Sequence, residues 1–208
     1  MKYIKKFNQH SLYEAYIVGV EFIKPNLDGF EFIGWFVLDK EFDLELSKKV
    51  EKSFEKFYAD EGLYDIIEPL NTQIRPNQVI TLGLDFSPVS REKAIEILEL
   101  VEKELYTNKG LKTLSSKDKE YKPYYCGSVY ERDISYHQGT VWPYLLMFYN
   151  EGLRKYKKKI NNEIAIKEML YEYCIGNVSE IYDAEEPRLP NGAFAQAWSI
   201  AMLITNRK

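Results

Sequence analysis

The stretch SPVSREKAIEILELVEKELYTNKG, residues 87–110, constrains the fold more than any other part of the chain. Ser90 is a helix-capping residue type, and Gly110 is a typical helix stop. Apolar side chains recur between them at the spacing that places them on one face of a helix: Ile95, Leu98, Val101 and Leu105. This pattern predicts an amphipathic helix that buries one side against neighbouring elements.

Similar periodicity recurs along the chain. Residues 42–62 predict a second amphipathic helix that ends near Gly62. Five further helices are expected at residues 9–24, 76–86, 140–157, 161–174 and 193–206. Residues 26–40 form either a short hairpin or a loop packed with aromatic side chains. We therefore expect an all-α protein of roughly seven helices.

Short turns alternate with two long loops, at residues 107–139 and 175–192. If the helices form hairpins, loops of this kind emerge on one face, where binding residues usually lie. No internal repeat, linker or low-complexity segment interrupts the sequence. A chain of 208 residues therefore reads as one domain, residues 1–208.

Charge and cysteine content exclude several classes of protein. The net charge is −4, so nucleic acid is not an expected partner. No apolar run reaches the ~20 residues that span a membrane, and the N-terminus lacks the pattern of a secretion signal. Cys126 and Cys174 have neither metal-ligand spacing nor the number needed for a disulfide framework. We expect a reduced, cytoplasmic protein without membrane contact.

Polar side chains surround Pro76 in the stretch IRPNQVITLGL, just before a predicted helix. Arg75, Asn77 and Gln78 could point from the helix end toward a ligand. The alternative is structural: the two amides cap the helix, and Arg75 pairs with a nearby acid.

The stretch ERDISYHQGTVWPYLL, residues 131–146, also carries polar side chains at the start of a predicted helix, together with a histidine, a glycine and a tryptophan. Gly139 permits a close backbone approach or a positive φ angle, and Trp142 offers a large flat surface. His137 is one of two histidines, so a zinc site is not expected, and we predict no metal or cofactor. His137 could be buried for structural reasons or could bond to a neutral polyol.

The third polar stretch is GNVSEIYDAEEPRLPNGAFAQAWSIAMLI. Most of its acids suit an exposed surface loop. Glu180 differs, because Val178 and Ile181 flank it and could turn its carboxylate inward. Gln196 and Trp198 lead into the last predicted helix. The tyrosine-rich loop at residues 110–127 could form one wall of a pocket or be simply solvated.

These stretches resemble a known family. IRPNQ, YTNKGLKTLSSKDKEY, ERDISYHQGTVWPYLL and SEIYDAEEPRLPNGAFAQAWSIAMLI are similar, in that order and at similar spacing, to the C-terminal amylo-α-1,6-glucosidase domain of glycogen debranching enzymes. The similarity covers roughly residues 60–206. Residues 1–59 match only in helical character.

The resemblance implies an (α/α)6 barrel and a glycoside hydrolase that removes α-1,6-linked glucose stubs with inversion. In such enzymes one carboxylic acid protonates the leaving oxygen and a second carboxylate activates water. The general base of the family maps onto Glu180. By similarity, the glucose subsite consists of Arg75, Asn77, Gln78, Asp133, Tyr136, His137, Gln138, Trp142, Gln196 and Trp198.

The chain also departs from the family pattern. The general acid of the family is an aspartate in a W-M-D-like stretch, which this sequence lacks. Seven predicted helices are fewer than twelve. Tyr144 stands where the resemblance leads us to expect a tryptophan. We therefore expect the C-terminal half of a barrel, which needs an N-terminal half or self-association to cover its apolar faces.

Three functions remain open at this point. The first is an α-1,6-glucosidase module whose acid comes from elsewhere. The second is a non-catalytic α-glucan-binding or remnant module. The third is a helical interaction scaffold. It is disfavoured, because such a scaffold has no evident need for so many Arg, Asn, Gln, His and Trp residues at its helix ends.

Overall fold

The computed structural model describes residues 15–19, 35–39, 44–85, 87–157 and 167–205. These residues belong to two compact units. The smaller comprises residues 1–55 and 85–88, and the larger comprises residues 56–84 and 89–208. The prediction of a single domain over residues 1–208 stays a prediction.

The smaller unit contains a β-hairpin and a helix. Strand β1 (Ala15–Gly19) pairs antiparallel with β2 (Trp35–Asp39), with Ile17 opposite Val37. Helix α1 (Leu44–Phe54) follows. The prediction of a helix over residues 9–24 is wrong for residues 15–19, and its other residues lie outside the described ranges. Of the two alternatives for residues 26–40, the described part forms one strand of a hairpin.

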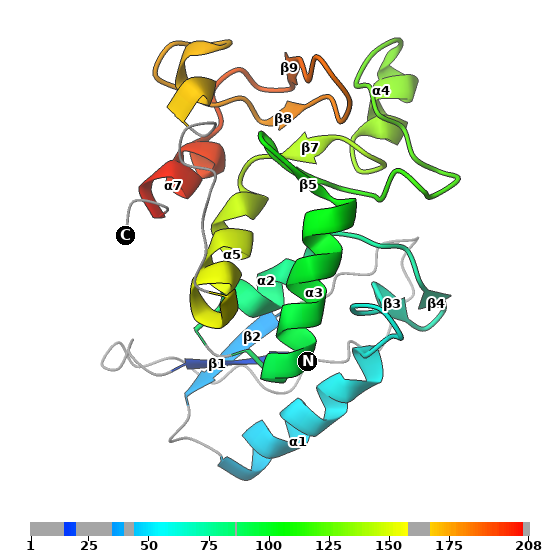
Figure 1. Ribbon diagram of the computed structural model, residues 1–208, viewed down its shortest axis with the longest axis vertical. Helices are drawn as coiled ribbons and strands as arrows, with labels where there is room; N and C mark the ends of the chain where they lie inside the picture. The colour runs from blue at the N-terminus through cyan, green and yellow to red at the C-terminus, as the bar shows by residue number, and fades with distance from the viewer. Residues whose placement is uncertain (1–14, 20–34, 40–43, 86, 158–166, 206–208) are drawn as a thin grey trace, which may run out of the picture. The chain divides into compact units, whose positions relative to one another are not determined.

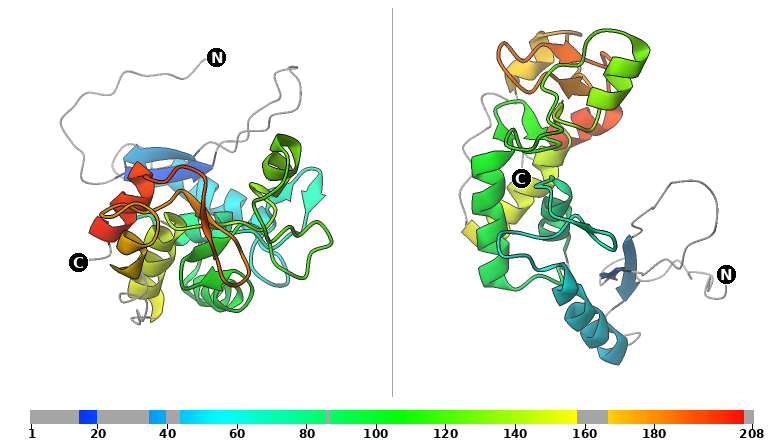
Figure 2. Two further views of the ribbon diagram at one scale, coloured as in Figure 1. Left: turned by 90° about the horizontal axis from the view of Figure 1, so that it is seen from above. Right: turned by 90° about the vertical axis from the view of Figure 1, so that its right-hand side faces the viewer.

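The larger unit has a helical layer with short strands at one end. Its helices are α2 (Asn77–Gly83), α3 (Arg91–Glu104), α4 (Val129–Ser135), α5 (Leu145–Gly152) and α7 (Ala197–Thr205). Helices α2, α3 and α5 contact one another, and strands β5–β9 lie beyond the C-terminal end of α3 (Figures 1 and 2). Shorter helical turns are η1 (Glu55–Phe57), η2 (Leu153–Lys157) and η3 (Met169–Tyr171).

Helix α3 confirms the predicted cap. The hydroxyl of Ser90 accepts the N–H of Lys93 at 3.2 Å, which satisfies one of the free donors of the first turn. The buried side chains of α3 form one face of the helix: Ala94, Ile97, Leu98, Leu100, Val101 and Glu104. Ile95 is only half-buried, so the buried face is centred slightly away from the predicted one.

The chain has two further sheets, both antiparallel. Strands β3 (Ile66–Ile67) and β4 (Leu70–Asn71) form a short hairpin. The other sheet has five strands in sequence order: β5 (Tyr106–Thr107), β6 (Gly110–Lys112), β7 (Val141–Trp142), β8 (Ile181–Tyr182) and β9 (Pro190–Asn191). Leu111 lies opposite Trp142, and Val141 opposite Tyr182. This sheet joins the two long loops predicted at residues 107–139 and 175–192.

The predicted all-α class, with roughly seven helices in half of an (α/α)6 barrel, is therefore wrong. The described residues form a mixed α/β structure with nine strands in three sheets. Most of these strands are two or three residues long, whereas an alternating pattern needs four to eight residues to be recognised. Strand β7 also pairs with β6 and β8, which are distant from it in sequence, so local periodicity carries no sign of these pairs.

A two-residue strand also interrupts the predicted helix 140–157. Val141 and Trp142 pair as β7, a turn follows at Pro143, and α5 begins only at Leu145. Residues Leu153–Lys157 then continue with π-helical geometry. The strand places Trp142 at the sheet rather than on the helix.

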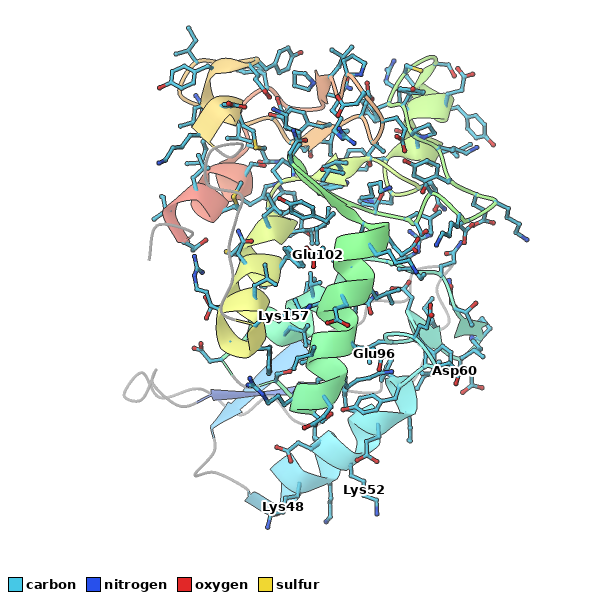
Figure 3. The ribbon with its side chains drawn as sticks, in the orientation of Figure 1. Lys48, Lys52, Asp60, Glu96, Glu102 and Lys157 are labelled. Atoms are coloured by element: carbon cyan, nitrogen blue, oxygen red, sulfur yellow. The ribbon has the colours of Figure 1, made fainter. Side chains whose placement is uncertain are left out.

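The core of the larger unit joins the helices to the sheet. Its largest fully buried side chains come from both layers: Leu82, Ile97, Leu98, Leu105, Leu111, Leu114, Leu146, Met169, Ile181, Tyr182 and Met202. Most charged residues of α3 lie on its outer side, although Glu104 is buried: Figure 3 shows Glu96 and Glu102 on α3, and Lys157 pairs with Glu99 of that helix at 3.0 Å. Exposed pairs of this kind contribute little to stability. In the described ranges no helix is long and apolar enough to cross a membrane.

Candidate functional site

A single carboxylate, that of Glu180, gathers hydrogen bonds from three directions. Its Oε1 atom accepts the hydroxyl of Tyr136 and, at 3.3 Å, the side-chain amide of Gln196. Its Oε2 atom accepts the backbone N–H of Ala193 at 3.0 Å. Glu180 is half-buried, so the three donors fix the carboxylate while one side stays open to solvent.

The sheet explains the position of Glu180. Val178 and Ile181 are fully buried on either side of it, as the sequence suggested, and anchor this segment to the core. The backbone N–H of Glu180 donates to the carbonyl of Ala193 at 2.9 Å, and this bond extends the pairing of β8 with β9. Gly192 has a φ of +69°, and a Cβ there would lie 2.5 Å from Oε2 of Glu180. Only glycine fits this turn beside the carboxylate.

Tyr136, which bonds to the carboxylate, belongs to a group of packed aromatic rings. The Tyr136 ring meets Trp142 edge-on, with centroids 4.9 Å apart, and His137 stacks on Trp142 at 5.2 Å. Trp142 also meets Trp198 at 5.8 Å, and Trp198 stacks on Tyr144 at 4.8 Å. We call these five residues the aromatic cluster. Trp198 is 45% exposed, so a flat surface remains available to a ligand.

The imidazole of His137 is electrostatically linked to this cluster. Desolvation lowers its pKa, the nearby Arg75 guanidinium lowers it further, and the Glu180 carboxylate opposes both. The residue retains contact with solvent, which limits the size of the shift. The result is a neutral imidazole near neutral pH, which can both donate and accept hydrogen bonds.

Arg75 joins three loops at the edge of the aromatic cluster. Its Nη1 atom donates to the carbonyl of Thr113 at 3.1 Å and of His137 at 2.7 Å. Its Nη2 atom donates to the side-chain amide oxygens of Gln73 and Gln138, both at 2.8 Å. These donors therefore hold the loop that carries His137 and Gln138 in place.

Asn77 and Gln78 also bond to the protein. Asn77 donates to Asp65 at 2.9 Å, and Asp65 lies 3.7 Å from Nε of Arg75. Gln78 is buried, donates to the carbonyl of Arg75 at 3.0 Å and accepts the N–H of Leu63 at 3.2 Å. These contacts favour the structural alternative for both amides, although neither caps α2.

The tyrosine-rich loop packs against the segment after Glu180. Tyr121 donates to Glu185 at 2.7 Å, and the backbone N–H of Tyr125 donates to Asp183 at 2.8 Å. Burial and the Glu185 carboxylate raise the pKa of Tyr121, so its hydroxyl remains a donor. Asp183 is buried, and the interpretation of the acidic cluster as an exposed loop is wrong for this residue.

Comparison with known proteins identifies the family. The family model described as amylo-alpha-1,6-glucosidase matches residues 16–205. The chain belongs to the amylo-alpha-1,6-glucosidase family. It is accordingly a glycoside hydrolase-type module, as the sequence motifs predicted. None of the curated proteins matches it significantly.

Solved structures show where the fold of this amylo-alpha-1,6-glucosidase family member recurs. The chain is similar to the GH63 mannosylglycerate hydrolase from Thermus thermophilus, at 15% identity and a TM-score of 0.57 over 77% of this chain and 37% of that one. It is also similar to the neutral trehalase Nth1 from Saccharomyces cerevisiae, at 16% identity and a TM-score of 0.56 over 81% of this chain and 30% of that one. The chain thus spans 37% of the length of the first structure and 30% of the second.

The predicted site residues fall into three groups. The first group shares contacts with Glu180 or the aromatic cluster: Tyr136, His137, Trp142, Gln196 and Trp198. Arg75 and Gln138 support the edge of this cluster. The side chains of Asn77 and Gln78 bond elsewhere, and Asp133 is exposed on α4, where its main-chain carbonyl accepts the N–H of Tyr136.

Three contributors to the site of this family member were not among the predicted site residues. Tyr144 stacks on Trp198, and its aromatic character two residues after Trp142 was the available signal. Ala193 contributes only its backbone N–H, which no side-chain pattern can reveal. Gly192 contributes the absence of a side chain. Across the described residues, no group of three His, Cys, Asp or Glu side chains could hold a metal ion, and both cysteines are free.

Proposed function

We propose that this chain carries the general base and the glucose subsite of an inverting amylo-α-1,6-glucosidase, and that a polypeptide segment outside it supplies the general acid. The observation that carries the proposal is the Glu180 carboxylate, held by three donors, one of which, Tyr136, packs against the aromatic cluster that contains the partly exposed Trp198. The match of the chain to the family over residues 16–205 supports it. The proposed location is cytoplasmic.

The reaction assigns one proton transfer to this chain. Water attacks the anomeric carbon while Glu180 accepts its proton, and the bond from that carbon to the leaving oxygen breaks. A second carboxyl group, about 6.5–9.5 Å from the first in inverting enzymes, gives its proton to that oxygen. Trp198 provides an apolar face for a sugar ring, with the buried Trp142 packed behind it, and His137 and Gln196 provide polar groups for the hydroxyls of the sugar.

The outer surface of α7 gives a place for the missing segment. The helix has the sequence AWSIAMLIT and buries Ser199, Met202 and Leu203, yet Ile204 is 66% exposed. A helix that is apolar all round is normally covered on both sides. We propose that the segment carrying the acid covers it; self-association would show instead as a dimer in light scattering.

An activated substrate tests the proposal. α-D-glucosyl fluoride loses fluoride without needing a proton, so a chain with only a general base can hydrolyse it. We expect release of fluoride and β-glucose, and a drop of at least about 100-fold in Glu180→Gln, the usual effect of removing general base catalysis. No glucose should appear from a limit dextrin, whose leaving oxygen requires the acid.

A second candidate, a non-catalytic α-glucan-binding module, predicts a different result. The aromatic cluster supports this candidate, because stacking on aromatic rings is enough to bind a sugar without catalysis. Under this alternative, calorimetry detects maltooligosaccharide binding, but fluoride release is equal in the wild type and Glu180→Gln. That outcome contradicts the catalytic proposal.

A further inference from the structure

We propose that Tyr136 is a positioning residue that holds the general base in a fixed place relative to Trp142, the buried centre of the aromatic cluster. Its hydroxyl orients the Glu180 carboxylate, and its main-chain carbonyl fixes the indole of Trp142. This inference rests on the proposed function of Glu180. It gives Tyr136 a role different from the contact with glucose that the family resemblance implies.

The hydroxyl of Tyr136 is committed to Glu180. It donates to Oε1, while the ring is packed against His137 at 4.7 Å and Tyr125 at 5.8 Å. Burial, the hydrogen bond and the charge of Glu180 raise the pKa of Tyr136. The phenol therefore keeps its proton, and the ring has little room to turn toward a sugar.

The main-chain carbonyl of Tyr136 holds the indole of Trp142. It accepts Nε1 of Trp142 at 3.2 Å and the hydroxyl of Thr140 at 2.5 Å. Tyr136 directly follows α4, where carbonyl groups lack a partner within the helix and are free to accept other donors. One residue thus holds both the carboxylate and the indole, although Glu180 and Trp142 lie on different strands or loops.

This arrangement also distinguishes the two oxygens of Glu180. Oε1 receives two donors, Tyr136 and Gln196, whereas Oε2 receives only Ala193 among the described residues. An ionised carboxylate has about two acceptor sites on each oxygen. We assign Oε2 as the atom that accepts the proton of the attacking water. Tyr136 and Gln196, which bond to Oε1, then orient the carboxylate for this role.

Kinetics with α-D-glucosyl fluoride separate positioning from sugar contact. In Tyr136→Phe the ring and carbonyl remain but the hydroxyl is lost. We expect kcat to fall about 10- to 100-fold, as for a displaced catalytic group, with KM and the Kd of maltooligosaccharide within about twofold. The matched control is Tyr130→Phe on the preceding helix α4, a tyrosine that is 73% exposed, which should retain wild-type kinetics. A rise in KM and Kd with unchanged kcat would overturn the positioning role.

Crystal structures of the wild type and Tyr136→Phe test the same role without turnover. We expect the Glu180 carboxylate to rotate in the variant while the indole of Trp142 stays in place. If the wild type shows no bond between Tyr136 and Glu180, the inference is wrong even when Glu180 is required for fluoride release. If Glu180→Gln leaves fluoride release unchanged, the proposed function fails, and the rotation of Glu180 still decides whether Tyr136 positions it.

Discussion

Gly192 lies against the carboxylate of Glu180 so closely that a Cβ atom would come within 2.5 Å of Oε2. The two residues belong to neighbouring segments of one hairpin, and the backbone N–H of Ala193, next to this glycine, bonds to the same oxygen. The turn therefore shapes the face of the carboxylate that we assign to water. A side chain at position 192 is a direct way to disturb it.

Gly192→Ala should reduce hydrolysis of α-D-glucosyl fluoride by at least about 10-fold, because the added methyl group displaces Glu180. The positive φ adds a strain of about 1 kcal/mol to the folded state. Gly176→Ala is the matched control, since Gly176 also has a positive φ, +81°, but a methyl group added there would have nothing within 4 Å. Equal activity of the two variants would show that strain alone, and not contact with Glu180, matters.

Arg75→Lys should lower the free energy of unfolding by about 2–4 kcal/mol, measured by urea denaturation. Lysine cannot reproduce the fork of donors that reaches the Thr113 and His137 carbonyls and the Gln138 side chain. Arg91→Lys is the comparison, because Arg91 is exposed and donates to the carbonyl of Tyr156 at 3.1 Å. Similar losses in both variants would contradict the role of Arg75 in joining the loops.

The lowered pKa of His137 predicts a pH dependence of stability. The folded state binds the proton less readily than the unfolded state, whose histidine titrates near pH ~6.5. Stability is therefore full above about pH 7 and falls as the pH drops through ~6.5 toward the lower folded value. Urea denaturation at about pH 7.5 and about pH 5.5 should show a smaller difference in His137→Gln than in the wild type.

A direct measurement of the same pKa uses the two histidines of the chain. Their ring protons can be followed by NMR titration and assigned with the His137→Gln variant. The His137 resonance should titrate below about pH 6.5, the ordinary value. A midpoint at or above that value would mean that Glu180 outweighs desolvation and Arg75 together.

Trp198→Ala should weaken maltooligosaccharide binding about 5- to 10-fold in calorimetry, corresponding to the ~1–1.5 kcal/mol of an aromatic stacking contact. Trp198 is 45% exposed and rests on Tyr144, so it presents one face to a ligand. Tyr173→Ala removes another exposed aromatic residue and should leave the affinity unchanged. Loss of affinity in both variants would indicate a non-specific apolar effect.

Some features of the protein were predictable because they depend on neighbours in sequence. The cap of α3 at Ser90 follows from a hydroxyl three residues before a free N–H. Gly139 was expected at a special backbone position, and it has a φ of +152°, with a Cβ position only 2.4 Å from the carbonyl of Lys122. The motifs around Glu180 and Trp142 likewise indicated the family that the comparison then identified.

The sequence by itself determined the helices with strong periodicity, the special glycine and the family, because each is encoded in residues close together along the chain. Only the tertiary structure decided that Val141 pairs with Tyr182, and that Tyr136 reaches Glu180 across 44 positions. Two-residue strands carry no periodic signal, and Asn77 and Gln78 look like sugar ligands until their protein partners are known. Contacts between distant segments depend on how the whole core packs, which no local pattern records.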